Sequence, residues 1–370
     1  MKTDYPIIAQ AAITLLPKLN SFSNLPLMER CGGAEAFFAE NTTALNALYQ
    51  EFNIRTNAFD RTNALEEARK ELDSINKYGI SICSFEDTGF PFRLRQCPDT
   101  PLVFYYKGKL KSNEHTYLAI VGTRKASDHC KKRVEQILQD LAEARNELVV
   151  VSGLAFGIDI TAHSNCLKYD IPTYAVLGHG LNMIYPASHK HIAEKIIEQG
   201  GALISEFPCS TTILPVNFLQ RNRIIAGLCD ATLLAESAVK GGGMATARMA
   251  ASYNRDVMTL PGRPEDKMSA GCNLLIKENV AALTENAEDI ARILNLNCKS
   301  RQHLQTSLNL FSCEDNEETI RKILLERNAM NIDELSICTN IPISELTALL
   351  MKLELEGIVS GLPGKNYILN

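Results

Sequence analysis

Between Tyr117 and Asn295, short runs of apolar residues alternate with amphipathic stretches of roughly a dozen residues. Continuous apolar strands that alternate with helices are typical of a parallel sheet that helices cover on both faces. The pattern therefore predicts an α/β domain over residues 117–296, with a Rossmann-like, mostly parallel, doubly wound sheet. Strands are expected at Leu118–Val121, Leu148–Val151, Thr173–Leu177, Ala202–Ile204, Ala231–Ala235 and Val257–Leu260.

The flanking segments have other patterns. Residues 1–75 are rich in helix formers and predict a small helical domain. Residues 76–116 carry several prolines around short apolar stretches, and we expect a lead-in segment with one or two edge strands. The polar residues 297–316 are expected to be a linker. Residues 317–370 show three helical stretches and then a hairpin, which predicts a winged helix.

Composition limits the partners of the chain. Its 370 residues, 45% of them hydrophobic, are enough for two or three domain cores. The net charge of −5 means that any polyanion must bind to local clusters of Lys and Arg. Eleven scattered cysteines without zinc spacing predict free thiols, a cytoplasmic location and no metal site. Because no apolar run reaches ~18 residues, no membrane contact is expected; Ile7–Leu16 is expected to be an amphipathic helix.

Glycines and small hydroxyl residues gather where the predicted strands end. Ligands of such sheets bind beyond the carboxyl ends of the strands. Free backbone N–H groups at helix starts attract anions there. Glycine is also the usual residue of a βα turn, so one such loop alone would indicate little. Together the loops predict an anion site, and its expected members are Gly122, Thr123, Ser127, Ser152, Gly153, Gly178 and Gly180.

Cationic side chains occur at the same loops. Arg124 follows the first strand, Lys240 precedes three glycines, and residues 221–223 (Arg-Asn-Arg) are expected to open an apolar helix over Ile224–Leu228. On a helix the two arginines would diverge by roughly 200°, so one is expected to reach a phosphate while the other binds the protein. A structural ion pair is the alternative for each of them. The residues expected to contact phosphates are Arg124, Arg221, Asn222, Arg223, Lys240, Gly241, Gly242, Gly243, Thr246 and Arg263.

Catalytic chemistry is not expected. Asp159, Glu206 and Glu236 fall near the strand ends but lack the paired positions that general acid–base chemistry requires. No set of carboxylates suits the two metals of a nuclease. Asp159 and His163, four residues apart, are expected to form a structural pair. The GxG at residues 178–180 follows the third strand, and no third glycine stands where the dinucleotide fingerprint needs one, so no dinucleotide cofactor is expected.

The motifs VGTRKAS, VSGLAFGIDITAH, GHGLNMIYP, FLQRNRIIAGL, GGGMATARMA and SAGCNLLI follow one another over Tyr117–Leu283. In this order they resemble the DNA-processing protein A (DprA/Smf) family. The resemblance implies a homodimer that binds and protects incoming single-stranded DNA and helps to load the RecA recombinase in natural transformation, with no cofactor and no turnover. It assigns DNA contacts to residues 122–124, 152–153 and 221–223, and to Lys240 with its glycines. The chain departs from the family at His179, where relatives show a small residue, and around Lys240, which lacks the usual serines.

Two other functions remain open. Lysine-decarboxylase-like nucleotide phosphoribohydrolases share the Rossmann-like core, but their PGGxGTxxE motif needs a glutamate one helical turn after the glycines. The corresponding stretch here, Gly241 to Ala250, has Arg248 near that place and no carboxylate. A regulatory protein that binds a small anion is the other possibility, and its affinity would not depend on strand length. From Asp315 onward, five Lys and Arg stand against nine Asp and Glu. The winged helix is therefore expected to contact protein instead of DNA.

Overall fold

The computed structural model describes residues 5–16, 19, 21–54, 61–144, 147–297, 313–327, 329–362 and 364–369. The chain divides into two compact units, Met1–Lys299 and Ser300–Asn370. Each unit has a hydrophobic core of its own.

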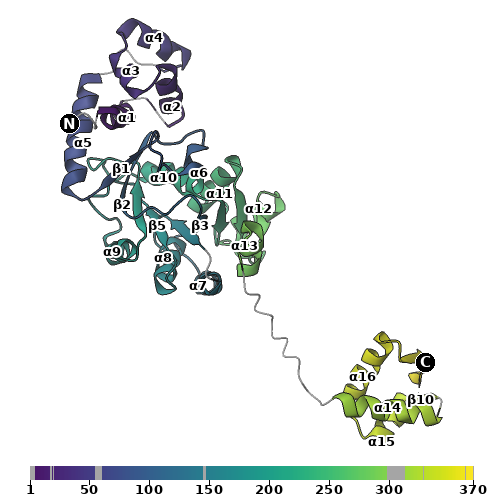
Figure 1. Cartoon of the computed structure of the whole chain (residues 1–370). Helices are drawn as coiled ribbons and strands as arrows, with labels where there is room; N and C mark the ends of the chain where they lie inside the picture. The colour runs from purple at the N-terminus through teal and green to yellow at the C-terminus, as the bar shows by residue number, and fades with distance from the viewer. Residues whose placement is uncertain are drawn as a thin grey trace. The chain divides into compact units, whose positions relative to one another are not determined.

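A nine-stranded sheet forms the centre of the first unit (Figure 1). Its strands are β1 (Ser81–Ser84), β2 (Val103–Gly108), β3 (Thr116–Val121), β4 (Leu148–Ser152), β5 (Thr173–Val176), β6 (Ala202–Ser205), β7 (Ala231–Leu234), β8 (Asp256–Thr259) and β9 (Ala282–Leu283). The order is β1-β2-β6-β5-β4-β3-β7-β8-β9. Strands β1 and β2 form an antiparallel pair at one edge, and β2 runs antiparallel to β6. The other pairs are parallel, so the predicted Rossmann-like sheet and its six strands are confirmed.

The strand order reverses between β3 and β7. From β3 the chain moves outward through β4, β5 and β6, and then returns to place β7 on the other side of β3. Val121 at the end of β3 pairs with Leu234 at the end of β7. In doubly wound sheets, ligands bind outside the carboxyl ends of the strands at such a reversal. The loops after β3 and β7 are therefore the first place to seek a binding site.

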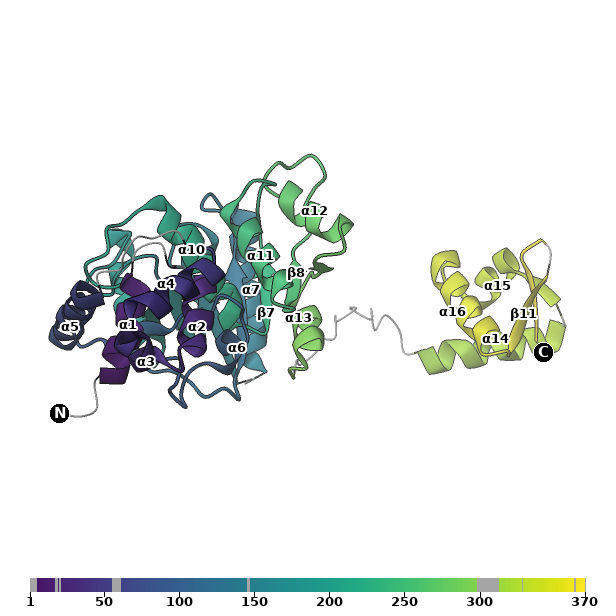
Figure 2. The same cartoon turned by 90° about the horizontal axis from the view of Figure 1, so that it is seen from above.

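Helices cover both faces of the sheet (Figures 1 and 2). One face carries α7 (Asp128–Glu143), α8 (Ile158–Lys168), α9 (Lys190–Glu198) and α13 (Ala287–Leu294). The other face carries α10 (Pro215–Leu228), α11 (Gly242–Ser252) and α12 (Ala270–Lys277). Alternate residues of a strand point to opposite faces: in β3, Ile120 packs in the core under α7, whereas Ala119 packs in the core under α10 and α11. Burial on both faces explains why the central strands, such as β3, β4 and β7, consist mostly of apolar residues.

The N-terminal helices share a core with the sheet edge. These helices are α1 (Tyr5–Leu15), α2 (Ser21–Arg30), α3 (Ala34–Ala39), α4 (Thr42–Glu51) and α5 (Arg61–Lys77). Leu102 and Val103, at the start of β2, are buried among their apolar side chains. Glu71 of α5 also accepts a hydrogen bond from the backbone N–H of Cys209, at 2.7 Å. Apolar and polar contacts thus join this helical segment to the sheet.

Arg93, in the short helix α6 (Phe92–Arg95), joins the lead-in segment to the central strands. Its Nε lies 2.5 Å from Oδ1 of Asp230, at the start of β7. The second oxygen of Asp230 accepts the N–H of Tyr117 in β3, at 2.8 Å. Arg93 also donates to the backbone carbonyls of Asn113 and His115. One arginine thus ties the lead-in segment to the two strands between which the order reverses.

The second unit is a winged helix, as the sequence predicts. It consists of α14 (Cys313–Arg327), β10 (Ala329–Asn331), α15 (Ile332–Thr339), α16 (Ile343–Leu355), β11 (Val359–Leu362) and β12 (Asn366–Leu369). Strand β10 adds a third strand to the expected hairpin, in the order β10-β12-β11. Most of the predicted linker, residues 298–312, lies outside the described residues. Among the described helices, none combines the length and the apolar content that a bilayer crossing requires.

The turn before α8 gives a test of this packing. Gly157 has φ 79°, and a Cβ added there would lie 2.1 Å from the carbonyl oxygen of Thr123. Gly157→Ala should therefore lower the free energy of unfolding by about 2 kcal/mol or more, as measured by urea denaturation. The control is Gly89→Ala, whose added Cβ meets no atom within 4 Å. Equal denaturation midpoints for the two variants would contradict the expectation.

Candidate functional site

A cavity of about 390 Å³ opens where the strand order reverses, and we call it the switch-point cavity. Its walls come from the end of β3, the start of α8, the first half of α10, the loop after β7 and the start of α11. The predicted phosphate contacts that line it are Gly122, Thr123, Arg124, Arg221, Asn222, Lys240, Gly241, Gly242, Gly243 and Thr246. Segments more than a hundred residues apart in the chain thus meet at one edge of the sheet.

Two exposed cations stand at this cavity. Arg124 and Lys240 are both exposed, and neither forms an ion pair with an acidic side chain in the described part of the chain. The Arg124 guanidinium carbon lies 5.9 Å from the ring centroid of Phe218, which also lines the cavity. Unpaired cations keep their full charge for a ligand, so this arrangement favours an anion.

Helix α11 points its start at the same cavity. Its N-cap is Gly241, and no side chain caps it. The N–H groups of a first helical turn have no partner within the helix, and the helix dipole makes that end positive. The backbone at Gly242 and Gly243 lines the cavity. Backbone N–H donors and two side-chain cations therefore converge on one space.

The glycines of the cavity have different roles. A Cβ on Gly243 would lie 2.6 Å from the Leu234 side chain, and one on Gly122 would lie 2.5 Å from Ile158. These two glycines let the helix starts pack tightly on the strands. A Cβ on Gly242, in contrast, would meet no atom within 4 Å. Gly242 is thus the glycine that leaves open space for a ligand.

Arg221 forms part of the cavity lining from inside the protein, with only 4% of its surface exposed. Its Nη1 donates to the carbonyl of Gly153, at 2.8 Å, and to that of Val176. Nε donates to Asn222 at 3.3 Å. Burial lowers the pKa of Arg221 to about 10, although the Asp159 carboxylate opposes this shift. Arg221 therefore stays charged at neutral pH beneath the exposed cations.

Asp159 is the carboxylate that accompanies Arg221. It is buried at the start of α8, and burial raises its pKa. The charge of Arg221 and hydrogen bonds from the backbone of Ala155 and Gly153 act in the opposite direction. The carboxylate is thus engaged on the protein side of the cavity.

Arg223 does not belong to the cavity. Only 8% exposed, it pairs with Glu206 and donates to the carbonyl of Asp99. Asp99 in turn accepts the hydroxyl of Tyr253 at 2.7 Å. The expectation that one arginine of residues 221–223 points outward therefore needs correction. They do diverge, but both are buried because α10 begins at Pro215, so residues 221–223 lie inside the helix and not at its start.

Four other residues that were predicted to contact phosphate pack against other parts of the protein instead. Ser152 Oγ donates to the carbonyl of Ile120 at 2.6 Å. A Cβ on Gly153 would lie 2.6 Å from the Arg221 guanidinium, so this glycine makes room for the arginine. Gly178 faces Phe218, and Gly180 faces the backbone of residues 208–209. The structure thus does not bring residues 152, 153, 178 and 180 to the switch-point cavity.

His179, where the chain departs from the family pattern, closes its own loop. Its Nδ1 lies 2.9 Å from the carbonyl of Gly180, and its Nε2 accepts the N–H of Tyr185 at 3.2 Å. Both ring nitrogens are therefore occupied within the loop, and the ring is fully buried.

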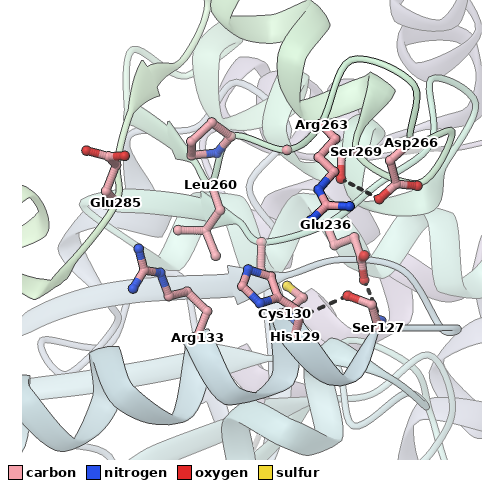
Figure 3. A pocket seen from close by; sticks show the side chains of 13 residues that line it. Ser127, His129, Cys130, Arg133, Glu236, Leu260, Arg263, Asp266, Ser269 and Glu285 are labelled. Atoms are coloured by element: carbon pink, nitrogen blue, oxygen red, sulfur yellow. Dashed lines mark hydrogen bonds between the residues drawn. The ribbon is translucent and has the colours of Figure 1, made fainter.

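The remaining two predicted contacts, Ser127 and Arg263, line a neighbouring cavity of about 690 Å³ (Figure 3). Ser127 caps α7, because its Oγ accepts the N–H of Cys130 at 3.1 Å. Its own N–H donates to Glu236, at 2.8 Å. The predicted anion site is thus divided between two cavities.

The predicted Asp159–His163 pair is wrong. His163 Nδ1 lies 2.8 Å from the hydroxyl of Thr173, which itself donates to the carbonyl of Val150. The hydroxyl has one proton, so Nδ1 must be the donor in the first bond. His163 therefore holds α8 to β5 instead of orienting Asp159.

Sequence reasoning missed the apolar wall of the cavity. Pro215, Phe218 and Leu219 of α10 line it. Pro215 is the first residue of the helix, a position that proline favours. That signal could have located the helix start and shown that the arginines lie inside the helix.

Among the described residues, no group of three or more His, Cys, Asp or Glu side chains is placed to hold a metal ion. Comparison with known proteins decides the family. A model described as DNA recombination-mediator protein A matches residues 81–295, and one for the DprA winged helix domain matches residues 313–365. This chain belongs to the DprA/Smf family.

Relatives of known sequence or structure agree. Protein Smf of Synechocystis sp. is 34% identical over 314 residues, which cover 76% of this chain and 78% of the relative. The X-ray structure of DprA from Streptococcus pneumoniae matches with a TM-score of 0.57 and 28% identity, over 76% of this chain and 100% of that one. DprA from Helicobacter pylori, whose structure was described for its single-stranded DNA binding mode, matches with a TM-score of 0.52 and 28% identity, over 59% of this chain and 97% of that one.

Membership confirms the resemblance seen in the motifs. The DprA/Smf family consists of DNA-processing proteins and not of enzymes, which sets aside the phosphoribohydrolase alternative. The local chemistry agrees with this outcome. Arg248, which lies near the position where those enzymes need a glutamate, forms an exposed ion pair with Glu278 at 2.8 Å.

The buried imidazole beneath the site predicts a pH effect. Burial lowers the pKa of His163 from 6.5 to about 3. Below pH 6.5 the unfolded chain binds a proton there that the folded chain does not, so stability is lost as the pH falls. His163→Asn should remove about 2 kcal/mol of the stability difference between pH 7 and pH 5, as measured by urea unfolding at both values. If wild type and variant lose equal stability, His163 does not titrate as described.

Proposed function

We propose that this chain binds single-stranded DNA through the switch-point cavity and holds it without cutting or modifying it. The observation that carries the proposal is the convergence of Arg124, Lys240 and the uncapped start of α11 on one space. Phosphate oxygens accept hydrogen bonds from such donors and are drawn by both positive charges. A negative chain as a whole can bind DNA in this way, because the cations are concentrated at one site.

Exposed rings beside the cavity favour a single strand over a duplex. Phe156 and Tyr185 are 51% and 50% exposed, and Phe156 directly follows Ala155, which lines the cavity. The Tyr185 ring lies 5.8 Å from that of Phe218, which lines the cavity. Unpaired bases can stack on such rings, at about 1–3 kcal/mol per base, whereas the bases of a duplex are already stacked on each other. Contacts to the backbone carry no base information, so little sequence preference is expected.

The first test removes the two exposed cations. Arg124→Ala and Lys240→Ala should each weaken binding to a single-stranded oligonucleotide about tenfold at low salt. Each should also lower the slope of log affinity against log salt by about 0.7. Fluorescence anisotropy over a salt series measures both quantities.

Lys125→Ala is the matched control, because Lys125 is exposed and follows Arg124 but does not line the cavity. It should keep most of the affinity. Wild-type affinity and salt slope in both Arg124→Ala and Lys240→Ala would remove the basis of the proposal. Binding that is tight but independent of strand length would favour a small-anion regulator instead.

The finer role follows the family. We propose that the chain protects incoming DNA in natural transformation and helps to load the RecA recombinase, acting in the cytoplasm as a homodimer without a cofactor and without contact to a membrane. The support is the family description as a recombination mediator and the resemblance of the ordered motifs.

RecA loading has a direct measurement. The protein should increase the amount of RecA bound to a single strand that is already covered by a single-strand binding protein. Arg124→Ala should lose this effect in parallel with its loss of DNA binding. Equal RecA binding with and without the wild-type protein would contradict the loading role while leaving DNA binding intact.

The winged helix fits a protein contact better than a DNA contact. Helix α16 exposes Met351 and Leu355, which are apolar. Its one lysine, Lys352, lies 2.6 Å from Glu317 of α14, and Glu356 is also within ion-pair distance. A DNA-reading helix would instead present unpaired cations to the phosphates.

A further inference from the structure

The larger cavity, which we call the α7 cavity, lies next to the switch-point cavity, because the loop after β3 contributes Ser127 to the first and Arg124 to the second. Its walls come from the first turns of α7, the ends of β7 and β8, and the segment before α12 (Figure 3). A volume of about 690 Å³ is within the range of small-ligand sites. The DNA binding proposed for the switch-point cavity does not involve the α7 cavity.

Two arginines face the α7 cavity from different elements. Arg133 comes from α7, and Arg263 comes from the loop after β8 (Figure 3). Both are exposed, and neither side chain forms a hydrogen bond or an ion pair with another described residue. Two unpaired guanidinium groups around one space provide bidentate donors for phosphate oxygens.

Acidic groups in the same cavity limit what can bind. Asp266 is engaged by the hydroxyl of Ser269 at 3.0 Å, and Glu285 lies exposed at one end (Figure 3). Glu236 is 4% exposed, and one of its oxygens accepts the N–H of Ser127. A carboxylate repels phosphate but accepts hydrogen bonds from the N–H groups of a base. A ligand with a phosphate at one end and N–H donors at the other, as in a nucleotide, suits this combination.

The two cavities share their dividing wall. Arg124 lines the switch-point cavity, and Ser127, three residues later, lines the α7 cavity. After β7, Glu236 lines the α7 cavity and its neighbour Ser237 lines the switch-point cavity. A DNA strand bound at one cavity therefore has to cross only this dividing wall to reach the other cavity.

We propose that the α7 cavity is a second nucleotide subsite, which receives the DNA strand after it leaves the switch-point cavity. Arg133 and Arg263 bind the phosphates of these later nucleotides, and Glu236 accepts N–H donors of a base. This inference rests on the proposed function, because it extends the same strand. It adds the path of the strand beyond the switch-point cavity and predicts that a longer strand binds more tightly.

The test compares oligonucleotides of about four and about twelve nucleotides. The double variant Arg133→Ala/Arg263→Ala should bind the short strand like wild type. On the long strand it should lose about tenfold in affinity, and its salt slope should fall by about 1.4, or 0.7 for each phosphate contact. The matched control is Lys132→Ala/Lys267→Ala, which removes two exposed cations from the same helix and the same loop but from neither cavity.

The outcomes separate this inference from the proposed function. If the arginine variant and the lysine control bind the long strand with equal affinity and salt slope, the second subsite is disproved. If Arg124→Ala and Lys240→Ala keep wild-type binding of the short strand, the proposed function fails. Titration with a free deoxynucleoside monophosphate distinguishes the source of the nucleotide. The free energy of binding of the free nucleotide is compared with the difference in binding free energy between the long and the short strand. If the first is as large as the second, and if the arginine variant loses this binding, the α7 cavity is a site for a free nucleotide and not part of the strand path.

Discussion

The buried guanidinium of Arg221 is the interaction on which the site depends. It binds the carbonyls of Gly153 and Val176, which follow or end two neighbouring strands, and it lies near the Asp159 carboxylate at the start of α8. A charge in this position is tolerated only because each of these groups is in place. Helix α10, two strand ends and the start of α8 are thereby held in one arrangement. The switch-point cavity opens on this frame.

Burial separates the cationic side chains into two groups with different roles. Arg93, Arg221 and Arg223 bind carboxylates and carbonyls of the protein and hold its segments together. Arg124 and Lys240 are exposed at the cavity and keep their charge for a ligand. An acidic chain can therefore carry an anion site, because long-range repulsion is screened over about 10 Å while charge-assisted hydrogen bonds act at contact distance.

The same edge of the sheet holds two cavities because two loops pass between them. Arg124 and Ser237 line the switch-point cavity, whereas Ser127 and Glu236 of the same two loops line the α7 cavity, so a ligand in one cavity lies against the wall of the other. Ser127 and Glu236 stabilise that wall by hydrogen bonding across it. A long, flexible polyanion suits such an edge better than a compact ligand, since it gains affinity with each further contact.

The sequence alone determined the strands, the helix-covered sheet, the winged helix and the loops that carry the site. Continuous apolar runs and glycine-rich turns are local features, and they specify such elements wherever they occur. Only the tertiary structure decided which of the predicted residues line the switch-point cavity. Arg124 and Arg223 look alike in the sequence, but Glu206 and the backbone of Asp99 bury the second. Ser152 and Gly153 look like phosphate contacts, but the carbonyl of Ile120 and the guanidinium of Arg221 occupy them. These partners come from distant parts of the chain, so burial and pairing are properties of the packed molecule.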